Sequence, residues 1–509
     1  MNPSLQVPFP LSTNLQDNVK WLKQQLGESS DMNYRQFELG VYPDTNGVAM
    51  FYIEGIVKYD IINEHITKPL LSSQENESYW RQDICFHDLL CQAITISDLS
   101  LSFDGDTIVS ALLEGKTILF ADGYNEALIA GTAGWEKRAV DEPQTQTVVR
   151  GPKEGFTEDL RTNTALIRRK IRSPQLRFLS LHIGRVTQTE VVIAYLVGIT
   201  DPKVVEEARQ RLARIDTDSV LESGYLEEYI EDVTYSPFPT IMNTERPDSA
   251  AAGLLEGQIA ILVDGTPFVL QAPVTFFRFL QSSEDYYQRF DIATFIRIIR
   301  YISFFVSMLL PALYIAITTF HQEMLPTTLL ISLAAQREGV PLPALAEAFL
   351  MEITFEVLRE AGVRMPRVIG SAISIVGALV LGQASVQAGL VSAAMVIIVS
   401  FTAISNFVTP ALNMAVAARL IRFGLMLLAG TFGLFGILTG CMAILIHLAS
   451  LRSFGVPYLT PIAPLVMTRL LDTFIRVPRW LAMVRPLSKT NRTRQKPYDK
   501  PSPPPKNRL

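Results

Sequence analysis

The longest uncharged stretch of the chain limits what the chain can fold into. Residues 368–418 contain no Asp, Glu, Lys or Arg. A membrane-spanning helix needs about 20 apolar residues, so this run is too long for one crossing and is predicted to double back. The predicted fold-back is Gly382–Gly389 (GQASVQAG), where two glutamines interrupt two apolar arms. Arginines on both sides of the run are typical of a hairpin whose ends meet one cationic surface: Arg364, Arg367, Arg419 and Arg422.

The two arms of this hairpin are rich in glycine, serine and alanine. Small residues let helices pack closely in lipid, which predicts a tight helix–helix seam. They can also line a narrow water-filled path. Periodicity leaves both interpretations open, and either one places the chain in a membrane.

Composition divides the 509 residues into a soluble and a membrane part. Overall, 48% of the residues are hydrophobic, and nearly all long apolar runs lie in 291–480. The predicted fold class is two N-terminal cytoplasmic α/β units, a polytopic helical transmembrane domain and a disordered basic tail. The predicted boundaries are an N-terminal extension at 1–34, subdomains at 35–150 and 151–290, the membrane domain at 291–484 and the tail at 485–509.

Several features favour a cytoplasmic side for the soluble region. The N-terminus lacks the cationic-then-apolar pattern of a signal peptide. Three cysteines, Cys85, Cys91 and Cys441, are too few for a disulfide framework, which fits a reducing compartment. The tail is rich in Lys, Arg and Pro with one acid, Asp499, which predicts disorder near anionic lipid.

Hydrophobic periodicity predicts the elements of both soluble subdomains. In the first, helices are expected at 14–27, 60–71 and 106–113, with strands at 47–57, 117–123, 127–132 and 145–151. In the second, helices are expected at 157–172, 201–214 and 219–229, with strands at 176–185 and 189–199. The helix at 157 is expected to be capped by Thr157 and Glu158. A hairpin at 259–273 with Asp264–Gly265 at its tip is expected to close the region.

The membrane part is expected to cross four to six times. Residues 301–320 form a first span containing Pro311, and 423–448 can span once or break around Gly430, Gly433 and Gly436. Between them, the helix at 343–361 carries Glu347, Glu352, Glu356 and Glu360. Because four carboxylates are costly in hydrocarbon, this helix is expected at the interface or against the soluble domains.

No pattern indicates an enzyme, a cofactor, a metal or nucleic-acid binding. LLEGKT ends like a phosphate-binding loop, but Ser110 stands where that loop needs glycine. Cys85, His87 and Cys91 lack a fourth ligand at suitable spacing, so ordinary core residues are expected. No acid lies inside the central run and no second copy of its hairpin is visible, which counts against a self-sufficient transporter.

Two segments resemble a known family: RGPKEGFTEDLRTNTALIRRKIRSPQLRF (150–178) and VGALVLGQASVQAGLVS (376–392). With the order of soluble region, membrane region and basic tail, they look like the A subunit of spore nutrient-germinant receptors, the GerA family. The resemblance covers about residues 35–475. It implies a multi-pass protein of the spore inner membrane that oligomerises into a channel. It also implies two partners, a permease-like B subunit and a lipoprotein C subunit, and release of monovalent cations early in germination.

The resemblance favours the water-filled interpretation of the hairpin, with several copies around an axis. Small or amide side chains would line the path: Gly377, Gly382, Gln383, Ser385, Gln387 and Ser392. Valines would form a dewetting constriction: Val376, Val380, Val386 and Val391. The acidic helix with Glu347, Glu352, Glu356 and Glu360 would transmit movement to the pore. Two alternatives stay open: a non-conducting scaffold for the B and C subunits, and a nutrient transporter.

Overall fold

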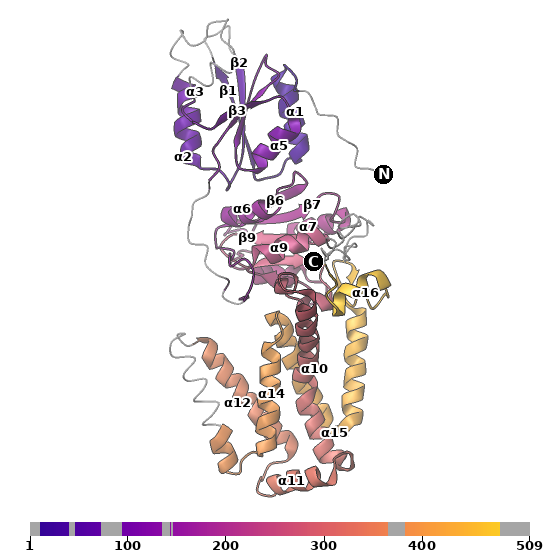
Figure 1. Cartoon of the computed structure of the whole chain (residues 1–509). Coiled ribbons are helices and arrows are strands. Elements are labelled where there is room, and N and C mark those ends of the chain that lie inside the picture. The colour runs from indigo at the N-terminus through magenta and orange to yellow at the C-terminus, as the bar shows by residue number, and fades with distance from the viewer. Residues whose placement is uncertain are drawn as a thin grey trace, which may run out of the picture. The chain divides into compact units, whose positions relative to one another are not determined.

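Two five-stranded sheets built in the same strand order form the N-terminal part of the computed structural model (Figure 1). The structure describes residues 11–39, 46–72, 94–134, 143, 146–364 and 382–478. These residues divide into two compact units. Unit 1 contains the described residues up to Glu231 together with Asn243–Pro273, and unit 2 contains Asp232–Met242 and the described residues from Val274 onward.

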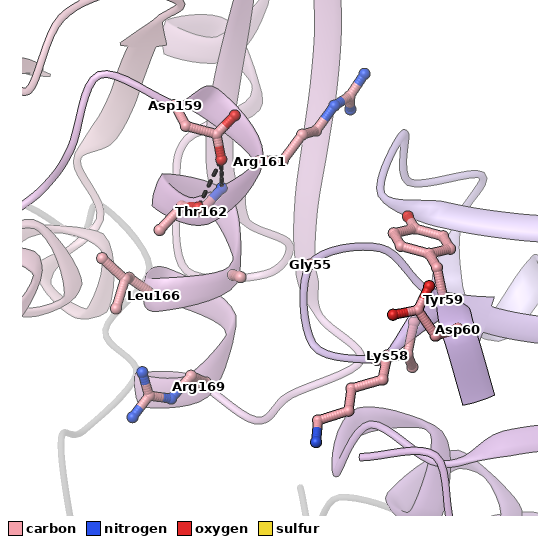
Figure 2. A pocket seen from close by; sticks show the side chains of 11 residues that line it. Gly55, Lys58, Tyr59, Asp60, Asp159, Arg161, Thr162, Leu166 and Arg169 are labelled. Carbon is pink, nitrogen blue, oxygen red and sulfur yellow. Dashed lines mark hydrogen bonds between the residues drawn. The ribbon is translucent and has the colours of Figure 1, made fainter. Parts of the chain in front are cut away.

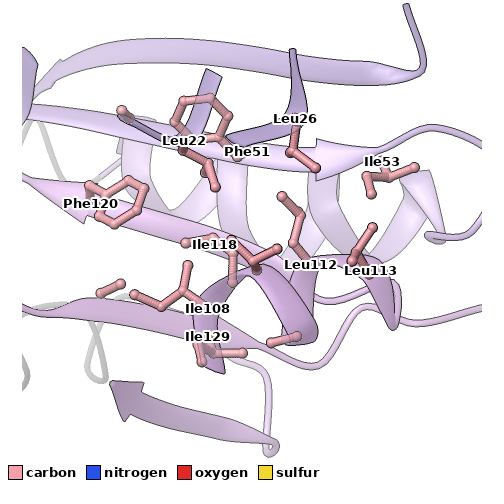
Figure 3. Packing of buried hydrophobic residues seen from close by; sticks show 14 of the residues in the cluster. Leu22, Leu26, Phe51, Ile53, Ile108, Leu112, Leu113, Ile118, Phe120 and Ile129 are labelled. Atoms are coloured by element: carbon pink, nitrogen blue, oxygen red, sulfur yellow. The ribbon is translucent and has the colours of Figure 1, made fainter. Parts of the chain in front are cut away.

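The first half of unit 1, residues 11–134, has the strand order β1-β2-β4-β5-β3. Its strands are β1 (Met32–Leu39), β2 (Asn46–Ile53), β3 (Leu99–Ser102), β4 (Thr117–Ala121) and β5 (Ala127–Ala130). Helices α1 (Leu15–Leu26) and α5 (Gly105–Leu113) bury their apolar side chains on one face of the sheet, as Figure 3 shows. The segments α2 (Tyr59–Ile62), η1 (Asn63–Thr67) and α3 (Lys68–Ser72) cover a second core cluster. The result is three layers around one sheet.

The second half, residues 146–231 and 243–273, has the equivalent order β6-β7-β9-β10-β8. Its strands are β6 (Leu176–Ile183), β7 (Thr189–Leu196), β8 (Met242–Thr244), β9 (Ile259–Val263) and β10 (Val269–Ala272). Helices α6 (Leu160–Lys170) and α9 (Pro247–Glu256) share one core cluster with the sheet. Helices α7 (Pro202–Ala213) and α8 (Ser223–Ile230) follow β7.

The two halves match in strand register as well as in strand order. Ile118 of β4 pairs with Phe51 and Ile129, and Ala260 of β9 pairs with Ala194 and Gln271 in the same pattern. The segment that leads into each central strand also repeats, since LLEGKTILFADG (112–123) corresponds to LLEGQIAILVDG (254–265). Unit 1 is therefore an internal duplication, which was not among the expectations from the sequence.

A repeated polar lock fixes the start of the first helix in each half. Buried Asn18 accepts from the Ser12 amide (2.9 Å) and donates to the Ser12 carbonyl (2.7 Å). Buried Asn163 does the same with Thr157, at 2.8 and 2.6 Å. The helix amides of Leu15 and Leu160 donate to an aspartate after the central strand: Asp122 (3.0 Å) and Asp264 (3.3 Å), respectively. Each lock satisfies buried backbone groups that would otherwise be costly.

Most expected elements of unit 1 are confirmed, with two corrections. The expected strand at 145–151 is wrong for its described residues, 146–151, which form no strand and leave Val149 93% exposed. The cap of α6 is Asp159, which accepts from the Thr162 amide, whereas Thr157 belongs to the lock. The expected N-terminal extension contains α1, whose buried face completes the first core.

Unit 2 is helical. It contains α10 (Phe290–Phe320), α11 (Thr327–Arg337), α12 (Ala344–Arg364), α14 (Ala393–Phe407), α15 (Leu412–Ser450) and α16 (Met467–Phe474). Before α10 lie the 3-10 helices η4 (Phe276–Leu280) and η5 (Ser283–Tyr286), η6 (Gln322–Met324) follows α10, and strands β11 (Arg452–Ser453) and β12 (Val456–Pro457) follow α15. In the described part of the chain, α10 and α15 are long and apolar enough to cross a membrane, and α14 is a shorter apolar helix. Helix α15 breaks at Gly433 (φ 61°, ψ −140°), one of the glycines at which a break was expected.

Candidate functional site

The predicted fold-back is only partly a turn. Residues 382–387 are helical, and the chain reverses over 388–391. The Gly389 amide donates to the Val386 carbonyl (3.1 Å), and the Leu390 amide to the Ser385 carbonyl (2.9 Å). Gly389 has φ +65°, a conformation that glycine adopts without steric cost. Ser392 then caps α14 by accepting from the Met395 amide.

The proposed path residues differ in exposure. Gln383 and Gln387 are exposed and stand four residues apart, so they share one helical face. Ser385 and Val386 are half-buried, while Gly382, Val391 and Ser392 are buried. Gly377, Val376 and Val380 lie outside the described residues.

A buried carboxylate joins α12 to the start of α14. Glu347 has no exposed side-chain surface, and its Oε1 accepts from both the amide (2.6 Å) and the hydroxyl (2.5 Å) of Ser392. Its other oxygen lies 3.9 Å from Nε of Arg337 at the end of α11. Three helices therefore converge on this carboxylate, and the Ser392 hydroxyl is already engaged.

The other acidic side chains of α12 form ion pairs with arginines, and two of these arginines belong to α15. Glu352 and Arg422 form an ion pair at 2.8 Å with both side chains at most 2% exposed. Arg419 pairs with Glu356 at 3.0 Å, and Glu360 pairs with Arg364 of its own helix. Arg422 also donates to the Ser307 carbonyl of α10 (3.4 Å). Removing one partner of the buried Glu352–Arg422 pair should cost about 3–5 kcal/mol, so this pair constrains how α12 and α15 pack.

These pairs correct two expectations about unit 2. Arg422 does not mark a cationic surface, because it is buried against Glu352. Helix α12 packs within unit 2 against α10, α14 and α15, so its carboxylates are compensated inside the helical unit. The sequence contained a signal for this arrangement, since one uncharged run separates Glu352 and Glu356 from Arg419 and Arg422.

A cavity of about 400 Å³ lies between the two halves of unit 1 (Figure 2). One wall is the turn after β2 with Gly55 and Lys58, followed by Tyr59 and Asp60 at the start of α2, and the other wall is formed by α6 and its N-cap. The α6 wall consists of Asp159, Arg161, Thr162, Ala165, Leu166 and Arg169. Groups of both charge signs therefore face the cavity, which suits a small polar molecule.

Two interactions shape this cavity. Arg161 bridges Glu54 (3.3 Å) of the first half and Glu190 (3.1 Å) of the second. Burial, followed by the charge of Glu54, raises the pKa of the Tyr59 hydroxyl at the edge of the cavity. Hydrophobic periodicity predicts the helix at α6 but not the cavity, because the two walls of the cavity are distant in sequence.

Comparisons with known proteins agree on one family. A family model described as "Bacillus/Clostridium GerA spore germination protein" matches residues 20–488. The chain is 48% identical to spore germination protein KA of Bacillus subtilis (strain 168), over 97% of this chain and 91% of that protein. It is 46% identical to the uncharacterized membrane protein YfkQ of the same organism, over 94% of this chain and 91% of that protein.

A third relative bears on the same point, and one solved structure is also similar in sequence. The chain is 39% identical to spore germination protein GerLA of Bacillus cereus, over 94% of this chain and 96% of that protein. A crystal structure of the N-terminal domain of the A subunit of the Bacillus megaterium spore germinant receptor GerK3 is 40% identical, with a TM-score of 0.42, covering 53% of this chain and 99% of that one. The chain belongs to the GerA family of spore germination proteins.

Proposed function

We propose that the chain is the A subunit of a nutrient-germinant receptor, and that several copies form a nutrient-gated cation channel in the spore inner membrane. Its partners would be a permease-like B subunit and a lipoprotein C subunit, with unit 1 on the cytoplasmic (core) side. The names of the relatives support the role in germination. The apolar lengths of α10 and α15 support the membrane location.

The observation that carries the channel proposal is the exposure of Gln383 and Gln387. Both amides lie on one face of a helical segment in a run without any charged residue. An amide that faces hydrocarbon loses its hydrogen bonds at a cost of several kcal/mol, so this face needs water or a neighbouring copy. Amide groups can replace part of an ion's hydration shell without trapping it by a fixed charge.

The contacts of Ser392 refine the proposed path. Because its hydroxyl is engaged by Glu347 and its side chain is buried, its role in the proposal is to anchor the hairpin to α12. Gly382, Gln383, Ser385 and Gln387 then remain the described lining candidates, together with Gly377 outside the described residues. In this scheme, a movement of α12 reaches the hairpin through Glu347. The proposed dewetting constriction is still formed by the four valines, Val376, Val380, Val386 and Val391.

The test is nutrient-triggered release of monovalent cations from spores that carry Gln383→Leu or Gln387→Leu. Both substitutions remove the amide at nearly constant volume, so we expect release to slow several-fold at normal receptor abundance. The matched control is Gln336→Leu, at an exposed glutamine of α11, which should leave release unchanged. Normal release from both hairpin variants would contradict the channel proposal and favour the scaffold.

A further inference from the structure

We propose that lipid of the membrane interface covers two exposed apolar surfaces at the end of unit 2 where α10 begins. One surface is the outer face of residues 292–300 in α10, and the other belongs to residues 462–475, which include α16. Together the two surfaces form a collar. This placement rests on the membrane location proposed above and is independent of ion conduction.

Both surfaces lie at the same end of unit 2. Tyr301 of α10 shares a core cluster with Leu448, near the end of α15, and with Tyr458, which follows β12. The Tyr301 hydroxyl donates to the Thr473 carbonyl of α16 (3.0 Å), and the centroid of its ring lies 5.1 Å from that of Phe474. The segment after α15 therefore folds back onto the first half of α10.

The length of α10 suits a helix that crosses the hydrocarbon and both headgroup regions. It has 31 residues, which extend about 46 Å at the α-helical rise per residue. The hydrocarbon core is about 30 Å thick, and the headgroup regions bring the bilayer to about 40–45 Å. The expected span, 301–320, accounts for the hydrocarbon alone, so the residues before 301 reach headgroup depth.

The first turns of α10 have the opposite orientation to that of a helix on a water-soluble protein. Arg297 is fully buried and Arg300 is 8% exposed. The exposed side chains of residues 292–300 are all apolar: Ile292, Phe295, Ile298 and Ile299. A helix at a water-facing surface turns its apolar face to the core, so this orientation indicates an apolar surrounding. The exposed apolar face continues through Ile302 and Phe305 into the expected span.

The buried charges beneath the collar compensate one another. Asp285, whose side chain is 2% exposed, pairs with Arg297 (3.3 Å) and with Arg300 (2.6 Å). Asp472 of α16 lies 3.6 Å from Arg297 and accepts from the Tyr286 hydroxyl at 3.0 Å. Two arginines meet two aspartates, so the formal charges of these four residues cancel. Because burial is most costly for a charge without a partner, these pairs are compatible with a lipid surrounding.

Residues 462–475 have the same inverted arrangement. Thr473 is buried, and Asp472 faces Arg297. Large apolar side chains are exposed instead: Ile462 (42%), Leu465 (64%), Met467 (69%), Phe474 (37%) and Ile475 (53%). An interfacial helix lies in the plane of the membrane, with its apolar face at the boundary between headgroups and acyl chains. Since this surface meets α10 where that helix enters the expected span, lipid is the occupant that its position favours.

The experiment measures the membrane depth of single labels in the full-length chain, reconstituted into vesicles of phosphatidylcholine and phosphatidylglycerol. In the background variant, serine replaces three cysteines: Cys85, Cys91 and Cys441. Phe295→Cys, Met467→Cys and Ile475→Cys are introduced one at a time and labelled with the fluorophore NBD. The fluorescence is quenched by lipids that carry a nitroxide either at the headgroup or deep in the acyl chain. Nutrient response of spores with each unlabelled variant reports that the chain folds and assembles.

The matched controls are Met442→Cys, at a residue of α15 that is 55% exposed, and Val186→Cys, at a residue that is 79% exposed in the turn between β6 and β7. We expect the headgroup nitroxide to quench the three collar labels several-fold more than the Val186 label, and the deep nitroxide to quench the Met442 label most. Collar labels quenched no more than the Val186 label, with the Met442 label still quenched, would overturn the inference. Loss of quenching at Met442 as well would overturn the membrane location itself, and the collar with it.

Discussion

The two halves of unit 1 share a fold but differ in how their first helices are used. Both begin with an asparagine lock, both place an Asp-Gly turn after the central strand, and both pair their strands in one register. Helix α6 is nevertheless covered on nearly every side, whereas α1 leaves Gln16, Lys20 and Gln24 exposed. The comparison teaches that the lock and the core determine the fold, while the outer face of the first helix can differ between the two halves.

The largest difference in unfolding free energy is expected for substitutions at one pair of equivalent positions in the two halves, Arg168 in α6 and Lys23 in α1. Arg168 pairs with Asp31 at 2.7 Å with both side chains at most 6% exposed, while Lys23 lies over the Tyr34 ring. Arg168→Ala leaves a buried anion and should cost about 3–5 kcal/mol of unfolding free energy. Lys23→Ala should cost about 1 kcal/mol or less. Thermal unfolding of the purified chain measures both, and equal shifts would contradict the comparison.

Loss of either asparagine lock should instead lower the stability of its half by a similar amount. Asn18→Ala and Asn163→Ala each remove two hydrogen bonds from buried backbone groups, which should cost about 2 kcal/mol in either half. Hydrogen exchange resolves the two halves, and we expect faster exchange in the half that carries the substitution. An effect confined to one of the two variants would show that the locks are not equivalent.

A smaller contrast is expected between Gly55 and Gly198. Alanine at either position is strained by about 1 kcal/mol because φ is positive. Only Gly55→Ala also places a methyl group against the backbone of α6, so its loss of stability should be greater. If Gly198→Ala proves the more costly in single chains, α6 does not approach the first half as described.

The smallest effect concerns pH and belongs to the second half. Burial, followed by the charges of Glu231, Glu222 and Glu228, raises the pKa of Glu227 in α8 to about 7. Because the folded-state pKa lies above the unfolded one, this group's stabilising contribution is fully present below the unfolded pKa and is lost as pH rises through about 7. The unfolding temperature should therefore fall between about pH 5.5 and about pH 8. Glu227→Gln should flatten that dependence, and an unchanged slope would contradict it.

Local patterns of the sequence predicted much of unit 1. The spacing of Leu15, Val19, Leu22 and Leu26 gave α1, and all four side chains are buried. The Asp264–Gly265 hairpin is also confirmed, because short turns depend on residues close in the chain. The strand expected at 145–151 failed because β-branched residues alone indicate a strand only where a partner strand is available.

Local sequence patterns could not predict contacts between segments that are distant in the chain. Pairing of Glu352 with Arg422, and engagement of Ser392 by Glu347, depend on how α12, α14 and α15 pack in space. The cavity between the halves has the same origin. The duplication is different, since LLEGKT and LLEGQI are both visible in the sequence, and a search for internal repeats would have found it.

The most direct test of the channel proposal is ion selectivity of the assembled receptor in a planar bilayer. Gln383→Glu places a fixed negative charge at an exposed position of the hairpin, whereas Gln336→Glu places the same charge on α11. The account predicts that nutrient-evoked current becomes more cation-selective with Gln383→Glu and is unchanged with Gln336→Glu. An unchanged reversal potential in the Gln383→Glu receptor, with current still present, would show that the hairpin does not line the ion path.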